Sequence, residues 1–513
     1  MTPIPMNRRQ LLARTGAAAG GALLVGAGAR VAWAGAAASG DDWAEPAVRQ
    51  SKDGVLTTQL RVAQNEVPIA TQPAQAVSYE GTYPGPTLDV RAGEKLNVHL
   101  HNDSEQPTNL HVHGLHVSPR QPSDDVLLDI EPTQGYPYQY ELPADHPGGT
   151  FWYHAHRHML SDNQVFGGQF GMLVVRGALD ELPGVKGLPE RAFIMSQMQV
   201  VDGKVADADS SSLSDQVTLV NARYQPKLTM PVGGTQRWRL INTSSIFLRL
   251  KLDGHQLHVI AIDGNALEKP SARTILEIPP GGRADVLVPS AKAGTFKLRS
   301  LSWQSLGVFY TSMVPNPQVL ATLTVTGSGE KKPAPLPTKL LPVDSLVDAK
   351  VDRRRVFRLE EREPRGVGPL DAYEYYINGR LFDASVVNVQ VPLNATEEWK
   401  FVNLTYEPHP LHIHVNPFQI VAVNGDRGAA EPFYRDSALV PPFGSLTIRH
   451  RFLDFTGTFV MHCHILFHED HGMMELIEVY GKDGPGPRRR PGGHGHSMHP
   501  AAYCELTPPN KQA

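Results

Sequence analysis

Residues 458–475 read TFVMHCHILFHEDHGMME, and this stretch decides both the fold and the chemistry expected of the chain. It holds His462, Cys463, His464, His468 and Met473 within a dozen residues. Successive side chains of a strand point to opposite faces, so His462 and His464 share one face and Cys463 takes the other. A thiolate, a histidine and a more distant thioether suit a trigonal blue-copper centre, which needs a second histidine from elsewhere. The two flanking histidines are then left for a different metal.

The length and composition indicate a soluble multidomain protein. At 513 residues the chain has room for about three domains. Lysine plus arginine (48) nearly balance aspartate plus glutamate (52), so no basic excess points to nucleic acid. Plentiful proline (43) and glycine (46) favour short strands and turns over long helices. Of the two cysteines, Cys504 lies in a Pro/Gly/His-rich tail, so Cys463 is interpreted as a thiolate ligand.

The first 34 residues are predicted to be a targeting segment. Asn7-Arg8-Arg9-Gln10-Leu11-Leu12 resembles a twin-arginine signal, and an Ala/Gly-rich stretch leads to an A-x-A cleavage site at Ala32-Trp33-Ala34. The apolar run is too short and glycine-rich for a membrane-spanning helix. We therefore expect a partnership with the twin-arginine export machinery and a periplasmic or secreted bacterial protein. Removing the segment changes the formal charge from −4 to −8.

A strand-like phrase ending in asparagine occurs three times. It covers residues 93–102, 234–242 and 396–403, and in the first copy apolar residues alternate with polar ones. Copies at domain-sized intervals predict three related all-β domains. Alternating short strands with turn signals predict antiparallel sandwiches of the Greek-key type, with few and short helices. We expect joints at 177–191 and 327–342. The predicted boundaries are a signal peptide at 1–34, domains at 45–178, 190–328 and 343–482, and a disordered, histidine-containing tail at 483–513.

Three further histidine clusters accompany the first one. They are His111-Val112-His113, His154-Ala155-His156 and His409-Pro410-Leu411-His412-Ile413-His414. Each H-x-H pair presents two imidazoles on one strand face, which is how a sheet offers paired nitrogen ligands. The clusters lie in the first and last repeats only; the middle repeat has Leu250-Lys251-Leu252 at the equivalent place. We therefore expect the metal cluster between domains one and three, with domain two as a spacer that shapes a cleft.

These four motifs make the chain resemble a three-domain multicopper oxidase of the bacterial laccase type, over essentially the whole mature sequence. The resemblance implies cupredoxin-like domains and four copper ions: one type 1, one type 2 and a type 3 pair. It makes His409, Cys463 and His468 the type 1 ligands, with Met473 axial. The remaining ligands would be His111 and His412 for type 2 copper, and His113, His154, His156, His414, His462 and His464 for the type 3 pair.

The resemblance also implies a mechanism. A small donor would give single electrons to the type 1 copper through an exposed edge of His468, and O2 would be reduced to water at the trinuclear cluster. Glu469 resembles the family's proton-donating carboxylate. The second acid would be Asp124 or Asp125, and the spacing from His111 leaves the choice open.

Three functions remain in competition after this resemblance. The leading prediction is laccase-like oxidation of phenols and aromatic amines. The second is a periplasmic oxidase of Cu(I) or Fe(II) for copper tolerance, which the lack of a methionine-rich run disfavours. The third is a copper-free cupredoxin scaffold with a structural role, which the complete ligand set disfavours. The substrate and the redox potential are left undecided by the sequence.

Overall fold

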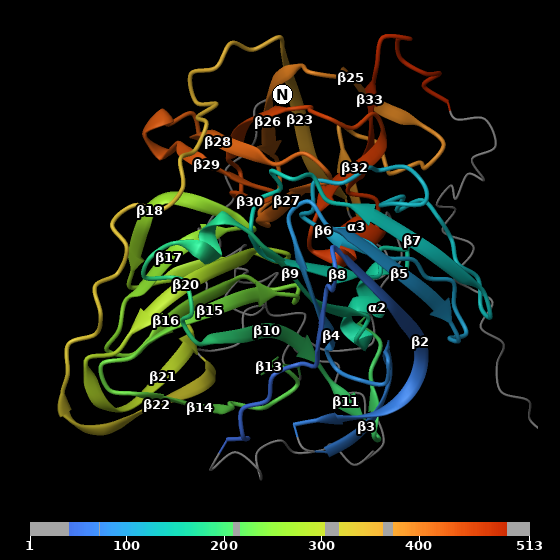
Figure 1. The fold of residues 1–513 in the computed structure, drawn as a ribbon. Helices are drawn as coiled ribbons and strands as arrows, with labels where there is room; N and C mark the ends of the chain where they lie inside the picture. The colour runs from blue at the N-terminus through green and yellow to red at the C-terminus, as the bar shows by residue number, and fades with distance from the viewer. Residues whose placement is uncertain (1–39, 71, 209–215, 303–317, 363–372, 490–513) are drawn as a thin grey trace, which may run out of the picture.

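The computed structural model describes residues 40–70, 72–208, 216–302, 318–362 and 373–489. The predicted signal peptide, Cys504 and all but the first seven residues of the predicted tail lie outside these ranges. Within them the chain forms three β-sandwiches, each built from one five-stranded and one six-stranded sheet. Figure 1 shows the first in blue and cyan at the right, the second in green and yellow at the left, and the third in orange and red at the top.

The first sandwich contains eleven strands. In sheet order they are β1 (Val48–Gln50), β4 (Gly85–Arg91), β9 (Phe170–Arg176), β8 (Gly149–His154) and β6 (His111–His113), then β11 (Val200–Val201), β12 (Lys204–Val205), β3 (Gln72–Tyr79), β2 (Val55–Ile69), β5 (Lys95–Asn102) and β7 (Gly135–Glu141). The hairpin β11–β12 follows β10 (Glu190–Met198), a strand of the second sandwich, in sequence, yet Lys204 pairs with Gln75 of β3. It therefore ties the second domain to the first.

The second and third sandwiches repeat this plan. The second comprises β13 (Val217–Val220), β10 (Glu190–Met198), β15 (Thr235–Asn242), β20 (Arg283–Pro289), β17 (Leu257–Ile262) and β18 (Asn265–Arg273), then β14 (Lys227–Pro231), β22 (Gln318–Glu330), β21 (Lys292–Ser300), β16 (Leu248–Leu252) and β19 (Leu276–Ile278). The third comprises β24 (Glu374–Ile377), β23 (Arg353–Arg362), β26 (Thr396–Asn403), β31 (Ser445–Arg451), β28 (Phe418–Val423) and β29 (Glu431–Arg435), then β25 (Val387–Pro392), β33 (Met474–Tyr480), β32 (Gly457–Cys463), β27 (His409–Ile413) and β30 (Ser437–Val440).

The repeated phrase forms equivalent strands, β5, β15 and β26, and its terminal asparagine has the same task in each. Asn102, Asn242 and Asn403 donate from Nδ2 to a backbone oxygen four residues on, at 2.8, 2.8 and 2.6 Å. Their Oδ1 atoms accept the backbone N–H two residues on, at 3.0, 3.1 and 2.8 Å. The side chain thus closes the loop that follows the strand, which explains why the sequence repeats it.

The sheets are mixed, whereas the turn signals predicted antiparallel ones. Each repeated strand pairs parallel with the first long strand of its domain (β2, β10 or β23) and antiparallel with a later one (β7, β20 or β31). The parallel pairs arise because the chain crosses to the other sheet between these strands, a connection that local turn chemistry does not reveal.

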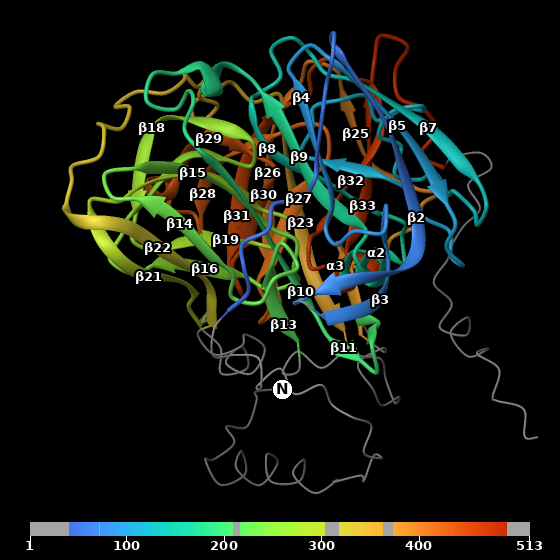
Figure 2. The ribbon, with the colours of Figure 1, turned by 60° about the horizontal axis from the view of Figure 1, so that its bottom comes forward.

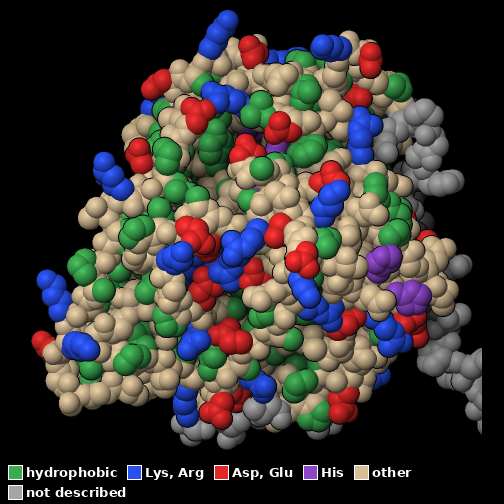
Figure 3. All heavy atoms as spheres, viewed as in Figure 1, with side chains coloured by type: hydrophobic (Ala, Val, Ile, Leu, Met, Phe, Trp, Pro, Cys, Tyr) green, Lys and Arg blue, Asp and Glu red, His purple; other side chains and the backbone are tan. Residues whose placement is uncertain are grey.

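Helices are few and short among the described residues, as expected. They are α2 (Ser161–Gly167) and α3 (Leu466–Asp470), with 3₁₀ turns η2 (Ala178–Glu181) and η6 (Arg427–Ala429) among others. Figure 2 shows α2 and α3 side by side, and their contacts join the first domain to the third. No helix in the described ranges is long and apolar enough to cross a membrane. Basic and acidic side chains are interspersed on the face in Figure 3.

Candidate metal centre

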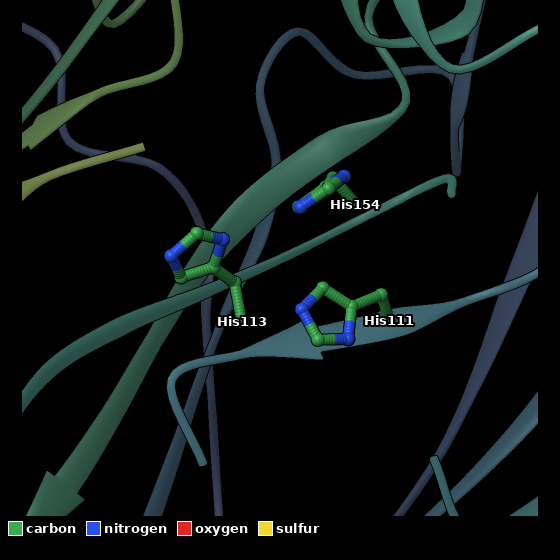
Figure 4. Close-up of side chains that lie close together, drawn as sticks. All are labelled: His111, His113 and His154. Atoms are coloured by element: carbon green, nitrogen blue, oxygen red, sulfur yellow. The ribbon is translucent and has the colours of Figure 1, made fainter. Parts of the chain in front are cut away.

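Strand register brings the histidine motifs together. In the first domain β6 pairs antiparallel with β8, which sets His111 opposite His154. In the third domain β27 pairs with β32, which sets His412 opposite His462. Directly opposed residues of an antiparallel pair lie on the same face of the sheet, so each domain presents converging imidazoles. Figure 4 shows the rings of His111, His113 and His154 around a common space.

Eight histidines meet between the first and third domains, as the sequence predicted for the cluster. All are buried; they are His111, His113, His154, His156, His412, His414, His462 and His464. The Nε2 atom of His462 lies 3.2 Å from Nε2 of both His156 and His414. On the other side, Nε2 of His464 lies 3.2 Å from Nδ1 of His113. Burial lowers the pKa of all eight rings, so they are neutral and offer lone pairs.

In several of these rings, one nitrogen contacts a carbonyl or carboxylate oxygen at the edge of the cluster. The other nitrogen of each ring is then available to bind a metal. The Nδ1 atom of His412 bonds the carbonyl of Asp436 at 2.9 Å, that of His154 bonds the carbonyl of Ala155 at 2.9 Å, and that of His111 lies 3.0 Å from Asp124. The opposite Nε2 atoms of these three rings are buried and have no partner among the described residues. Unpaired, neutral imidazole nitrogens that converge in this way fit copper ligation, with the outer partners fixing tautomer and orientation.

A second group lies on the opposite face of β32. The Sγ atom of Cys463 is 3.6 Å from Nδ1 of both His409 and His468, and these two nitrogens are 3.3 Å apart. Met473 is fully buried beside them, and its backbone N–H donates to His468. Burial raises the pKa of the Cys463 thiol, so a bound cation is needed to hold the thiolate. Two nitrogens, one sulfur and a nearby thioether fit a type 1 copper site.

The structure places the two aspartates differently relative to the histidine cluster. Asp124 is buried, lies 3.0 Å from Nδ1 of His111 and accepts the N–H of Val112 at 3.1 Å. The carboxylate of Asp125 instead accepts hydrogen bonds from Gln121 Nε2 at 3.0 Å and from the backbone N–H of Leu127 at 3.1 Å. Burial raises the pKa of Asp124 to about 8. Asp124 therefore lies at the cluster and Asp125 does not.

Glu469 lies in α3 against His156 and His462. Its Oε2 is 2.9 Å from Nδ1 of His462, its Oε1 is 3.5 Å from Nδ1 of His156, and Ser161 of α2 donates to Oε1 at 3.0 Å. Burial raises the pKa of Glu469. A buried carboxyl group beside two ligand rings is positioned to hold a proton next to the cluster.

The prediction of an exposed edge on His468 is wrong. The residue is only 4% exposed because Tyr375 of β24 stacks on its ring, with ring centroids 3.9 Å apart. Its Nε2 atom also faces Oε2 of Glu407 at 3.0 Å. Both residues approach from strands or loops that local sequence around His468 does not reveal.

Four residues near the metal groups were not predicted from the sequence: Tyr375, Glu407, Asp436 and Arg283. Glu407 stands two residues before His409, which is a signal that could have been used. Asp436 lies beside His113 and His412, and although burial opposes it, Arg283 holds the pKa of its carboxyl group well below the usual range. Arg283 belongs to the middle domain, which thus reaches the cluster although it supplies no histidine to it.

Comparison with known proteins gives the same family for all three domains. Sequence models described as multicopper oxidase match residues 61–179, 188–318 and 352–483. A multicopper oxidase of Staphylococcus aureus is 26% identical over 419 residues, covering 79% of this chain and 84% of the relative. A laccase of Bacillus stratosphericus is 24% identical and covers 79% and 91%. A cell division protein FtsP of Dickeya dadantii is 26% identical and covers 68% and 72%.

Solved structures show the same fold. A Campylobacter jejuni multicopper oxidase described as a metallo-oxidase superposes with a TM-score of 0.76 at 24% identity, covering 86% of this chain and 96% of that one. A laccase-like enzyme of Ochrobactrum sp. gives a TM-score of 0.70 at 24% identity and covers 85% and 99%.

Proposed function

The chain belongs to the multicopper oxidase family, whose members are O2-reducing oxidoreductases, and from this premise we propose that its reducing substrates are small phenols and aromatic amines. Bound copper would supply the redox chemistry, taking single electrons at the type 1 site and delivering four of them to O2 at the cluster. His409, Cys463, His468 and Met473 would hold the type 1 ion, and the eight clustered histidines the other three.

The observation that carries this proposal is a carboxylate next to the type 1 group, in a loop segment whose neighbouring residues are apolar and exposed. Glu407 lies 3.0 Å from Nε2 of His468. Glu407 itself is buried, at 5% exposed, whereas its sequence neighbours Tyr406 and Leu404 are 37% and 51% exposed. Phenols and aromatic amines need this combination, because each brings a ring to be covered and an O–H or N–H to be accepted.

The route from donor to cluster is short. The imidazole of His468 lies between Glu407 and Cys463. Cys463 is covalently joined to His462 and His464 in the same chain segment, and the carbonyl of Cys463 is 3.1 Å from Nδ1 of His462. Cys463 is thus directly adjacent in sequence to two ligands of the cluster, and all three residues are buried, which favours fast electron transfer.

Protons for the reduction of O2 would be held by Glu469 and Asp124. The first borders His156 and His462, and the second borders His111. Both carboxyl groups are buried, and burial raises the pKa of each. They can therefore carry protons at the cluster at a pH where exposed carboxyl groups are ionised.

A second candidate substrate is a reducing metal ion. It is favoured by the burial of His468 and Glu407, which a small ion approaches more closely than a ring does, and by the carboxylate of Glu407, which can bind a cation. Against Cu(I), seven of the eight methionines in the described ranges are buried, so they form no thioether patch on the described surface. We keep phenols and aromatic amines as the first choice.

The discriminating experiment is O2 uptake by the copper-loaded enzyme with 2,6-dimethoxyphenol, Fe(II) or Cu(I) as sole donor. We expect uptake with the phenol, and Glu407→Gln should raise its KM about 10-fold or more, the value of a hydrogen bond to a charged group. The matched control is Glu478→Gln on β33, whose carboxylate instead accepts Gln390. Uptake with the metal ions alone would overturn the proposal in favour of the second candidate.

We also propose that the protein is exported folded by the twin-arginine route. The supporting feature is the segment Asn7–Leu12 with the site at Ala32-Trp33-Ala34. Replacing Arg8 and Arg9 by lysine should keep the protein in the cytoplasm, as cell fractionation would measure, and normal export of that variant would contradict the assignment.

A further inference from the structure

Arg283 of the middle domain lies beside the histidine cluster, although this domain supplies no histidine to it. Arg283 begins β20 and is fully buried, and β20 contacts β8 of the first domain. Its Nη1 donates to Oδ1 of Asp436 at 2.6 Å and its Nη2 to Oδ2 at 2.7 Å. The ion pair is therefore bidentate, with two parallel N–H···O hydrogen bonds, and this geometry fixes the plane of the carboxylate.

Asp436 passes this constraint to ligands of both outer domains. Its Oδ1 is 3.1 Å from Nε2 of His113, a first-domain ligand. Its backbone carbonyl accepts Nδ1 of His412, a third-domain ligand, at 2.9 Å. The rings of His113 and His412 stack with centroids 3.7 Å apart and planes 13° apart. A single carboxylate residue therefore orients two stacked imidazoles that come from different domains.

Glycines leave room for this arrangement. Gly114, directly after His113, has φ of +87°, and a Cβ there would collide with the guanidinium of Arg283 and lie 2.6 Å from Oδ2 of Asp436. Gly281, two residues before Arg283, has φ of +76°, and a Cβ there would lie 2.7 Å from the ring of His464. The backbone of the middle domain at Gly281 thus packs directly against the ring of His464, with no room for a side chain between them.

Arg283 is itself anchored on its far side. Its Nε donates to the carbonyl of Thr150 at 3.3 Å, and the Thr150 hydroxyl donates to Asp285. Asp285 is bonded in turn by Arg237 and by Arg239, the latter at 3.0 Å. All five residues are buried, so this network of hydrogen bonds and ion pairs has little freedom to rearrange.

We propose that Arg283 is a positioning residue of the trinuclear cluster, acting through Asp436 to fix the rings of His113 and His412. Domain two then controls how tightly the cluster holds copper, beyond its role as spacer. The inference rests on the assignment of the eight histidines as copper ligands and is independent of the reducing substrate.

The expected effect is a selective weakening of the cluster. Removing a group that orients a ligand usually costs 10- to 100-fold in metal affinity, so we expect Arg283→Met to lower the affinity of the cluster for copper by about that factor. The type 1 group should be spared, because its ligands bond neither Arg283 nor Asp436 in the described structure.

The test measures copper rather than turnover. Copper-loaded wild type, Arg283→Met, Arg283→Lys and Asp436→Asn would be dialysed against increasing chelator, with copper per chain, the blue thiolate band and the EPR signal of the non-blue copper recorded. We expect Arg283→Met and Asp436→Asn to lose cluster copper at about 10- to 100-fold less chelator while the blue band persists. Arg283→Lys keeps the positive charge but not the bidentate hydrogen bonding of the guanidinium, so its affinity for copper should lie between those of wild type and Arg283→Met.

The matched control is Arg449→Met. Arg449 of β31 is buried like Arg283 and pairs with Glu398, but in the described structure it bonds neither a histidine of the cluster nor the network that anchors Arg283. It should lower thermal stability without changing cluster affinity or the EPR signal. If Arg283→Met does not accumulate, Asp436→Asn and Arg283→Lys carry the test. Wild-type chelator resistance and EPR in these variants, or parallel loss of blue and non-blue copper, would overturn the proposal.

Discussion

His450 of β31 is a histidine sealed into an apolar core, and His450→Phe has an effect that can be calculated. The side chain is fully buried, and neither ring nitrogen has a hydrogen-bond partner in the part of the chain that the structure describes. Trp399 and Phe452 pack on the ring with centroids 4.3 and 4.2 Å away. Burial, assisted by the charge of Arg355, lowers the pKa of His450 to about 3.

The direction of the change in stability with pH follows from proton binding to His450. An unfolded histidine titrates near about pH 6.5. Between that pH and about 3 the unfolded chain binds a proton that the folded chain does not, so stability falls as the pH falls through this window. From pH 7 to about pH 4.5 the loss is about 3 kcal/mol, at roughly 1.4 kcal/mol per pH unit. That corresponds to about 10 °C if a domain of about 140 residues unfolds alone, and about 3 °C if all three unfold together.

Scanning calorimetry of wild type and His450→Phe at both pH values measures this difference. Acidification should lower the Tm of the wild type by about 3 to 10 °C more than that of His450→Phe, which has no proton to bind. Any packing change in the variant shifts both values and cancels. Phe452→Leu, an apolar neighbour, should lower Tm equally at both pH values. Equal acid sensitivity of wild type and His450→Phe would refute the reasoning.

Three other substitutions test the site. Cys463→Ser should abolish the blue band and turnover while unfolding close to the wild-type temperature, as spectroscopy and calorimetry would show; normal turnover would disprove the type 1 assignment. Gly281→Ala should reduce cluster copper because its Cβ would press on His464, whereas Gly425→Ala, with similar φ and open space, should not; equal copper content in both would contradict the contact. Glu469→Gln should slow O2 reduction at least about 100-fold if it donates protons, and an unchanged rate in stopped-flow reoxidation would exclude that role.

The local parts of the site were predictable from the sequence. Alternation along a strand and an H-x-H spacing determine which imidazoles share a face, so the sorting of Cys463 away from His462 and His464 needed no structure. The repeated asparagine was visible as a pattern, and its hydrogen bonds in β5, β15 and β26 supply the reason. The metal clusters and the three sandwiches followed from these features.

The remainder depends on contacts between distant segments. Asp124 and Asp125 are neighbours in a loop, and only its folded path decides which one faces His111. The burial of His468 depends on Tyr375, ninety-three residues earlier in the chain. Arg283 meets Asp436 across a domain boundary, and no periodicity or spacing encodes that meeting. Packing of this kind has no local signal.

The central claim is that type 1 and trinuclear copper sites work in series to reduce O2 fully. The most direct test is the ratio of donor oxidised to O2 consumed by the copper-loaded enzyme, with peroxide assayed in the same sample. A one-electron donor should be consumed at four equivalents per O2, with no peroxide formed, because the cluster lies one residue from the type 1 cysteine. Two equivalents per O2 with stoichiometric peroxide would contradict the account.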